Sequence, residues 1–106
     1  MVVTFYAEDQ RNRANSVYLK LPAAQADYLL FALAYRLPDL VNPRGLLPTD
    51  LLLRINSVRR QFALGRAREF TSRDVPELEL LVNLEELEKI AERARTDGTN
   101  VLLFND

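Results

Sequence analysis

The 106-residue chain contains no histidine, no cysteine and no tryptophan. Without histidine it lacks the usual proton shuttle near neutral pH and the commonest metal ligand. Without cysteine it can form neither a disulfide nor a thiolate metal site, and it has no thiol nucleophile. Only carboxylate, arginine, lysine, tyrosine and hydroxyl chemistry remains, so zinc, copper and iron sites are not expected.

Sequence motifs of nucleotide binding and hydrolysis are absent as well. The chain has neither G-x-x-x-x-G-K-[ST] nor G-x-G-x-x-G, and its three glycines, Gly45, Gly65 and Gly98, stand where turns or helix ends need them. No G-x-S-x-G occurs, and without histidine a serine nucleophile has no triad partner. We therefore expect a protein that is not an enzyme and that binds no metal or cofactor.

Length and composition indicate one globular domain. Hydrophobic residues make up 48% of the chain and charged residues 27%, close to the averages of folded domains. At this length we expect a single domain over residues 1–106. The N-terminus lacks a basic region followed by a long apolar run, and the apolar run from Tyr28 to Tyr35 is far short of a bilayer span. We expect no export signal, no membrane anchor and a cytoplasmic location.

The net charge is only −1, but the charges are unevenly distributed along the chain. Residues 54–73 contain six arginines and one acid, whereas residues 74–106 contain nine acids and three basic residues. Either the two segments neutralise each other across the folded surface, or the arginines bind the phosphates of a nucleic acid. The second interpretation depends on Arg54, Arg59, Arg60, Arg66, Arg68 and Arg73.

The N-terminal third of the chain predicts two strands and a helix. Val2–Ala7 is β-branched and aromatic, and Ser16–Leu21 alternates apolar with polar residues, so each predicts a strand. The polar stretch Glu8–Asn15 between them predicts a hairpin loop, and hence antiparallel pairing. Pro22 is expected in the first turn of a helix that runs to about Arg36.

This first predicted helix is apolar on nearly every side, because only Gln25 and Asp27 are polar in residues 23–35. Such a helix is normally buried on more than one side. Either the sheet and a second helix enclose it, or a partner chain covers part of it. In the second case the contact residues are Tyr28, Phe31 and Tyr35.

A second helix is predicted from Pro48 to Gly65, with Thr49 or Asp50 as its cap. One stripe at spacings of four, three and four is typical of a core face. It consists of Leu51, Ile55, Val58 and Phe62. A second stripe lies on roughly the opposite side and consists of Leu53, Ser57, Arg60 and Leu64. Exposed leucines beside an arginine are typical of a contact patch, so we predict that a partner binds Leu53, Arg60 and Leu64.

Residues 75–82 support two interpretations. Asp74 with Glu77 resembles a capping box, whereas Leu78, Leu80 and Val82 alternate as in a half-buried strand. We favour the strand because Asn83-Leu84-Glu85-Glu86 is a second capping-box pattern, which predicts that a new helix starts there and ends at Gly98. With a last strand over Thr99–Phe104, the segment predicts a right-handed βαβ unit with parallel strands.

These elements predict a single α+β domain of order β-β-α-α-β-α-β. Its one mixed sheet joins the N-terminal antiparallel hairpin to the C-terminal βαβ unit and is covered by helices. We expect a non-catalytic adaptor or regulatory protein of a bacterium or phage, resembling in its mode of action an immunity protein, an antitoxin or a phage inhibitor. It would bind another protein or a second copy of itself. The alternative is a nucleic-acid-binding protein that uses the arginine-rich segment 54–73.

Overall fold

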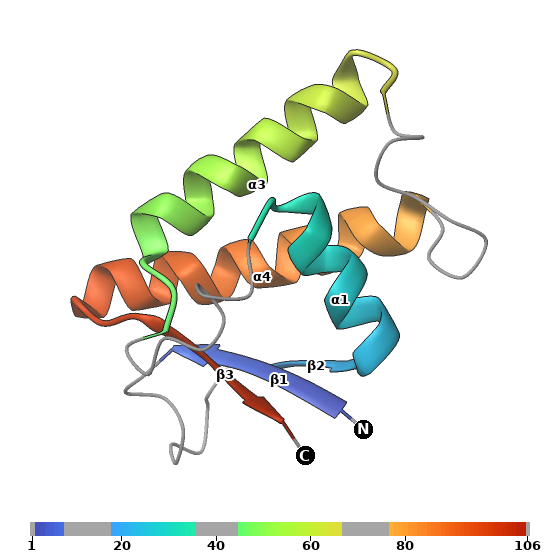
Figure 1. Ribbon diagram of the computed structural model, residues 1–106. Coiled ribbons are helices and arrows are strands. Elements are labelled where there is room, and N and C mark those ends of the chain that lie inside the picture. The colour runs from blue at the N-terminus through green and yellow to red at the C-terminus, as the bar shows by residue number, and fades with distance from the viewer. Residues whose placement is uncertain (1, 8–17, 36–44, 67–76, 106) are drawn as a thin grey trace.

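The computed structural model describes residues 2–7, 18–35, 45–66 and 77–105. Within these residues the chain order is two strands, three helices and a last strand (Figure 1). The elements are β1 (Val2–Ala7), β2 (Tyr18–Pro22), α1 (Ala23–Ala32), α3 (Pro48–Ala63), α4 (Glu77–Asp97) and β3 (Val101–Asn105). The predicted α+β class is confirmed. In the described parts of the chain, no helix is both long enough and apolar enough to cross a membrane.

The sheet has β1 in its centre, with the order β2-β1-β3. Both neighbours pair with β1 in the antiparallel direction, and Phe5 of β1 lies opposite Leu19 of β2 and Leu103 of β3. The predicted antiparallel pairing of the first two strands is therefore confirmed. The loop predicted over Glu8–Asn15 lies outside the described residues.

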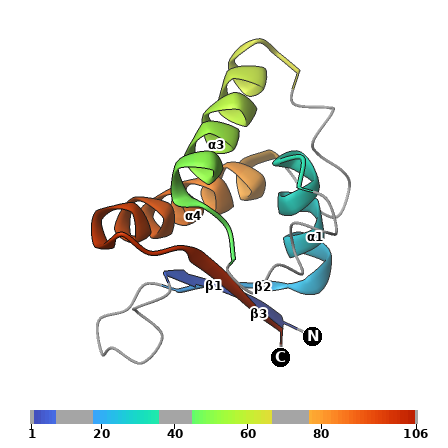
Figure 2. The same cartoon turned by 60° about the vertical axis from the view of Figure 1, so that its left-hand side comes forward.

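The three described helices lie on one face of the sheet (Figures 1 and 2). That face carries Val3, Phe5 and Ala7 of β1, which belong to the buried hydrophobic core. α1 and α4 pack on the sheet, and α3 packs mainly on α4. Figure 2 shows that α3 rises away from the sheet, so its outward side has no described element over it.

The predicted strand over residues 75–82 is wrong for the part that the structure describes, because residues 77–97 form the single helix α4. Leu80 is fully buried and heads a helical stripe of buried residues, whereas Leu78 and Val82 are 74% and 49% exposed. The alternation of these three residues is therefore incidental. The stripe has spacings of four, three, four and three, which fit a helix, and it consists of Leu80, Leu84, Leu87, Ala91 and Ala94.

Asn83 was expected to start a new helix, but it lies inside α4 and is only 6% exposed. Its Nδ2 atom has no hydrogen-bond partner among the described residues. A buried amide donor without a partner costs stability, on the order of 1–3 kcal/mol. The capping-box pattern was therefore misleading, because the core contacts on both sides of Asn83 continue the helix through it.

The predicted βαβ unit and mixed sheet are also wrong. No strand precedes α4 within the described segments, and β3 pairs antiparallel with the central strand β1. α4 has 21 residues and spans about 31 Å, so it carries the chain across the molecule before β3 returns along the sheet. The described sheet is therefore wholly antiparallel.

All three described helices end in the same backbone motif, in which the residue after the C-cap adopts a positive φ. Gly65 and Gly98 occupy this position after α3 and α4, as the sequence predicted. After α1 the position is held by Ala34, with φ of 60°. Because α1 stops at Ala32, it is shorter than the helix predicted up to Arg36. The left-handed conformation of Ala34 costs about 1–2 kcal/mol, which other contacts must offset.

Candidate functional site

The outward side of α3 carries two large apolar side chains in solvent. Leu53 is 71% exposed and Leu64 is 61% exposed, and Ser57 and Arg60 between them are exposed as well. The opposite stripe is the core face that the sequence predicted: Leu51, Ile55 and Val58 are buried, and Phe62 is partly buried against the core. We call Leu53, Ser57, Arg60 and Leu64 the α3 surface.

A groove of about 470 Å³ runs between α3 and α4 beside this surface. From α3 it is lined by Leu52, Leu53, Asn56 and neighbouring polar residues, so Leu53 belongs both to the α3 surface and to the groove wall. We call it the α3–α4 groove. Its lining residues are Thr49, Leu52, Leu53, Asn56, Arg59, Glu88, Glu92 and Arg95.

The charged residues of the α3–α4 groove are paired with one another. Arg59 forms an ion pair with Glu88 that joins α3 to α4, and Arg95 pairs with Glu92 within α4. The groove is therefore close to neutral. The Arg59–Glu88 pair is also an example of the neutralisation that the sequence suggested between the arginine-rich and acidic segments.

The side chain of Arg54 binds partners within the protein. Its Nε donates to Asp50 Oδ2 at 2.9 Å, and its Nη1 donates to the carbonyl oxygens of Leu33 and Ala34 at 3.0 and 2.8 Å. Its guanidinium also lies 4.1 Å from the centre of the Tyr35 ring. Arg54 thus ties α3 to the C-terminal end of α1.

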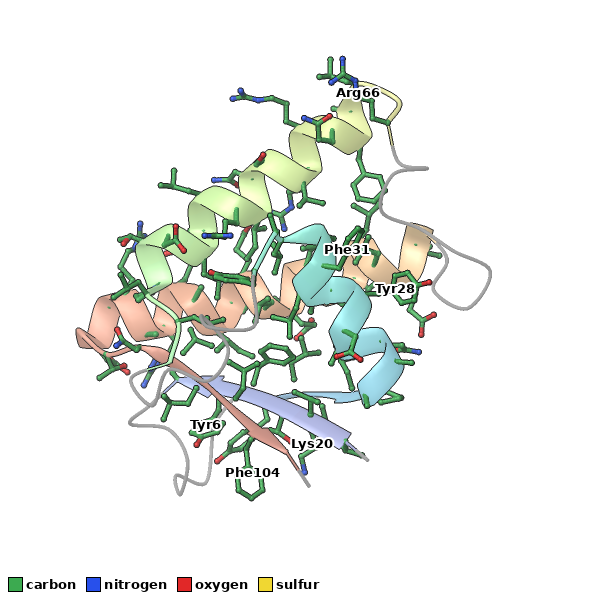
Figure 3. The ribbon with its side chains drawn as sticks, viewed as in Figure 1. Tyr6, Lys20, Tyr28, Phe31, Arg66 and Phe104 are labelled. Carbon is green, nitrogen blue, oxygen red and sulfur yellow. The ribbon has the colours of Figure 1, made fainter. Side chains whose placement is uncertain are left out.

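Of the six arginines predicted to bind nucleic acid, the four that the structure describes do not form one surface. Arg54 and Arg59 have internal partners, as described above, whereas Arg60 is exposed and Arg66 donates to the side-chain oxygen of Gln61 at 3.3 Å. Figure 3 shows Arg66 at the far end of α3. Arg68 and Arg73 lie outside the described residues, so their role stays a prediction.

Three residues of the first predicted helix were candidates for a partner contact, and Tyr35 lies beyond the end of α1. Of the three, Phe31 is the one with a largely exposed side chain, at 67%. Tyr28 and Tyr35 are partly buried and pack against the core. The hydroxyl of Tyr35 also donates to Asp50 Oδ2 at 3.3 Å. The structure therefore assigns Tyr35 to the same internal network as Arg54, and the sheet and α4 enclose much of α1.

Sequence reasoning missed the second face of the sheet. Figure 3 shows Tyr6, Lys20 and Phe104 on the side away from the helices. Lys20 and Phe104 both lie opposite Thr4 on β1, and the Tyr6 ring lies 6.1 Å from that of Tyr18. The alternation of the strands could have placed these residues on one face, but the order of the strands could not be read from the sequence.

The described residues contain no group of three or more carboxylates that could hold a metal ion. A hydrogen bond and the charge of Glu86 raise the pKa of Lys89, so this lysine stays protonated at neutral pH and is no candidate for a general base. The most distinctive features of the described surface are therefore exposed apolar side chains and a groove.

Comparison with protein-family models, with curated proteins and with solved structures gave no match to this chain.

Proposed function

We propose that this protein is a non-catalytic adaptor or regulatory protein that binds another protein through the α3 surface. The observation that carries the proposal is the pair Leu53 and Leu64, which are 71% and 61% exposed on one outward stripe beside the α3–α4 groove. We further propose that it is encoded by a bacterium or a phage and acts in the bacterial cytoplasm, in the manner of an immunity protein, an antitoxin or a phage inhibitor.

Two physical arguments support a partner at this position. Exposed leucines gain free energy when a partner removes them from water, by about 25 cal/mol for each Å² buried. Interfaces also concentrate their binding energy where an anchor side chain fills a pocket. Because Leu53 lies at the wall of the α3–α4 groove, a partner that fills the groove buries Leu53 as well.

The proposal is tested by capturing proteins from a lysate of the source organism and titrating the purified partner by calorimetry. The double variant Leu53→Glu with Leu64→Glu is expected to weaken binding by about 30-fold or more, because it places two charges in the apolar centre of the interface. Leu78→Glu is the matched control, since Leu78 of α4 is 74% exposed but belongs to neither the α3 surface nor the groove.

The control variant is expected to bind like the unchanged protein. If Leu78→Glu weakens binding as much as the double variant does, or if the double variant binds normally, the partner does not use the α3 surface. Circular dichroism of each variant shows whether the fold is intact, which is expected because all three leucines are exposed.

The nucleic-acid alternative has less support, because Arg54 and Arg59 are held by internal partners. Of the described arginines in segment 54–73, only Arg60 and Arg66 remain for phosphates. We therefore expect a flat fluorescence-anisotropy titration with DNA and with RNA at low salt. Binding that falls steeply with salt and is lost on replacing Arg60 and Arg66 with alanine would instead establish the alternative.

A further inference from the structure

We propose that the partner presents an amphipathic α-helix to the α3 surface, with carboxylates flanking its apolar stripe. This inference rests on the proposed function and specifies the chemistry of the partner. It is argued from the spacing of the α3 surface, from its charge and from the neutrality of the neighbouring groove.

The spacing of the α3 surface matches a helix. Leu53, Ser57, Arg60 and Leu64 follow one another at intervals of four, three and four, which is the repeat by which two helices pack along a common seam. The small Ser57 lies within the stripe and allows a close approach of a second backbone. α3 is about 24 Å long, and Figures 1 and 2 show no described element across its outward side.

The described charges on the α3 surface and its flank are positive: Arg60 lies within the stripe, and Arg66 lies on the flank away from the α3–α4 groove. Arg60 is exposed, and Arg66 just beyond the helix donates to the neutral side chain of Gln61. Neither arginine forms an ion pair within the residues that the structure describes. Asp50 is the single acid of α3, and Arg54 engages it on another side of the helix. Carboxylates on a partner would therefore meet two arginines that have no ion pair among the described residues, whereas lysines would be repelled.

The α3–α4 groove adds apolar contact without changing this charge preference. Its two arginines are paired with its two glutamates, so it favours neither sign. Its wall includes the exposed Leu53 and the nearly buried Leu52. An apolar side chain of the docked helix fits into the α3–α4 groove, while carboxylates of the same helix lie near Arg60 and Arg66.

The same charge argument disfavours a second copy of the chain docked by its own α3. Two such helices packed face to face would place Arg60 of each copy on one seam, and like charges on a seam oppose association. The complementary partner is therefore a helix that is acidic where α3 is basic.

Two synthetic helical peptides of about 18 residues, long enough to run along α3, test the inference. Both carry leucines at spacings of four, three and four, and they differ in having glutamates or lysines beside these leucines. Each is titrated into the isotopically labelled full chain by NMR. The glutamate peptide is expected to shift the amides of the α3 surface and to bind about tenfold tighter than the lysine peptide at low salt. This preference should vanish at about 0.5 M salt.

Arg60→Glu is expected to reverse the preference, because it replaces the central cation with an anion. Lys20→Glu is the control: it changes the charge of an exposed residue on β2 in the same way, on the sheet face away from the helices, and should leave the preference unchanged. Both residues are exposed, so both variants are expected to keep the fold, which circular dichroism checks.

Several outcomes would overturn the inference. They are equal affinity for the two peptides, no binding of either at millimolar concentration, and shifts confined to another surface. Tighter binding of a thymidine oligonucleotide at Arg60 would favour nucleic acid, and shifts of the α3 surface on concentration of the chain alone would favour a second copy. If a captured partner needs Leu53 and Leu64 but the peptides show no preference for charge, the proposed function stands and this inference fails.

Discussion

Replacing Gly45 with alanine is expected to lower the free energy of unfolding by about 3 kcal/mol. Gly45 has φ of +77°, a conformation that a side chain disfavours, and an added Cβ would lie 2.4 Å from the carbonyl oxygen of Val101. It would also lie 2.6 Å from a methyl carbon of Leu102. Because the first of these atoms belongs to backbone, the clash cannot be relieved by turning a side chain.

The clash falls on the bridge that fixes β3 to the start of α3. Leu46 N–H donates to Val101 O at 2.7 Å, and Val101 N–H donates to Leu46 O at 2.9 Å. Moving the Val101 carbonyl aside weakens both bonds and disturbs β3, which pairs with the central strand. The loss of stability is measured by urea denaturation followed by circular dichroism.

Gly65→Ala and Gly98→Ala are matched controls for this variant. Their φ angles of 77° and 70° are nearly the same as that of Gly45, but an added Cβ at either position meets nothing within 4 Å. Each is expected to cost about 1 kcal/mol, from the backbone conformation alone. If all three variants lost the same stability, the close approach of Gly45 to β3 would contribute nothing.

Gly45 shows what a sequence can and cannot indicate about a glycine. Its neighbours Asn42, Pro43 and Arg44 predict a turn by composition, and those three residues lie outside the described structure. The stronger reason for glycine is Val101, which is far along the chain and reaches Gly45 only through the pairing of β3. A contact between segments so far apart leaves no local pattern.

For the helices too, local patterns in the sequence could be predicted, whereas features that depend on contacts between distant segments could not. The sequence predicts α3 and its core stripe because the spacing of apolar residues within this one segment separates the buried side of the helix from the exposed side. α4 was divided in error because Leu78, Leu80 and Val82 satisfy a strand pattern and Asn83 satisfies a capping pattern. Burial decides between these patterns: Leu80 and Asn83 are both covered, and they share a helical face with Leu84 and Leu87.

The candidate site could be predicted from the sequence for the same reason as the core stripe. Leu53, Arg60 and Leu64 lie on the side of α3 opposite to its buried leucine and valine, so their exposure follows from helical spacing. Their binding role stays a prediction. The groove beside them could not be predicted, because it depends on α4 lying against α3. The sheet face that holds Tyr6, Lys20 and Phe104 could not be predicted either, because it depends on the order of the strands.

Arg54→Ala is expected to lower the free energy of unfolding by about 2–3 kcal/mol. The arginine donates to the carbonyl oxygens of Leu33 and Ala34, which the end of α1 leaves without helical partners. Its contact with the Tyr35 ring is worth about 0.5–1 kcal/mol of this loss. Removing the arginine takes away a hydrogen bond that helps to offset the strain at Ala34, and it leaves Asp50 without its cation.

Arg54→Lys is expected to retain part of the lost stability, because a lysine keeps the charge beside Asp50 but cannot reach two carbonyl oxygens and a carboxylate together. Arg60→Ala on the same helix is the control, and it should change stability by less than about 0.5 kcal/mol because Arg60 is exposed. Equal effects of Arg54→Ala and Arg60→Ala in thermal or urea unfolding would contradict the assigned network.

The difference between these two arginines also decides how binding at α3 can be measured. Because Arg54 holds α1 to α3, a binding defect in Arg54→Ala would mix lost contacts with a loosened fold. Arg60 carries the same charge six residues further along α3, and no hydrogen bond or ion pair of its side chain is found in the described residues. A binding change in an Arg60 variant with unchanged stability therefore reports on the surface itself, so charge tests of this protein belong at Arg60.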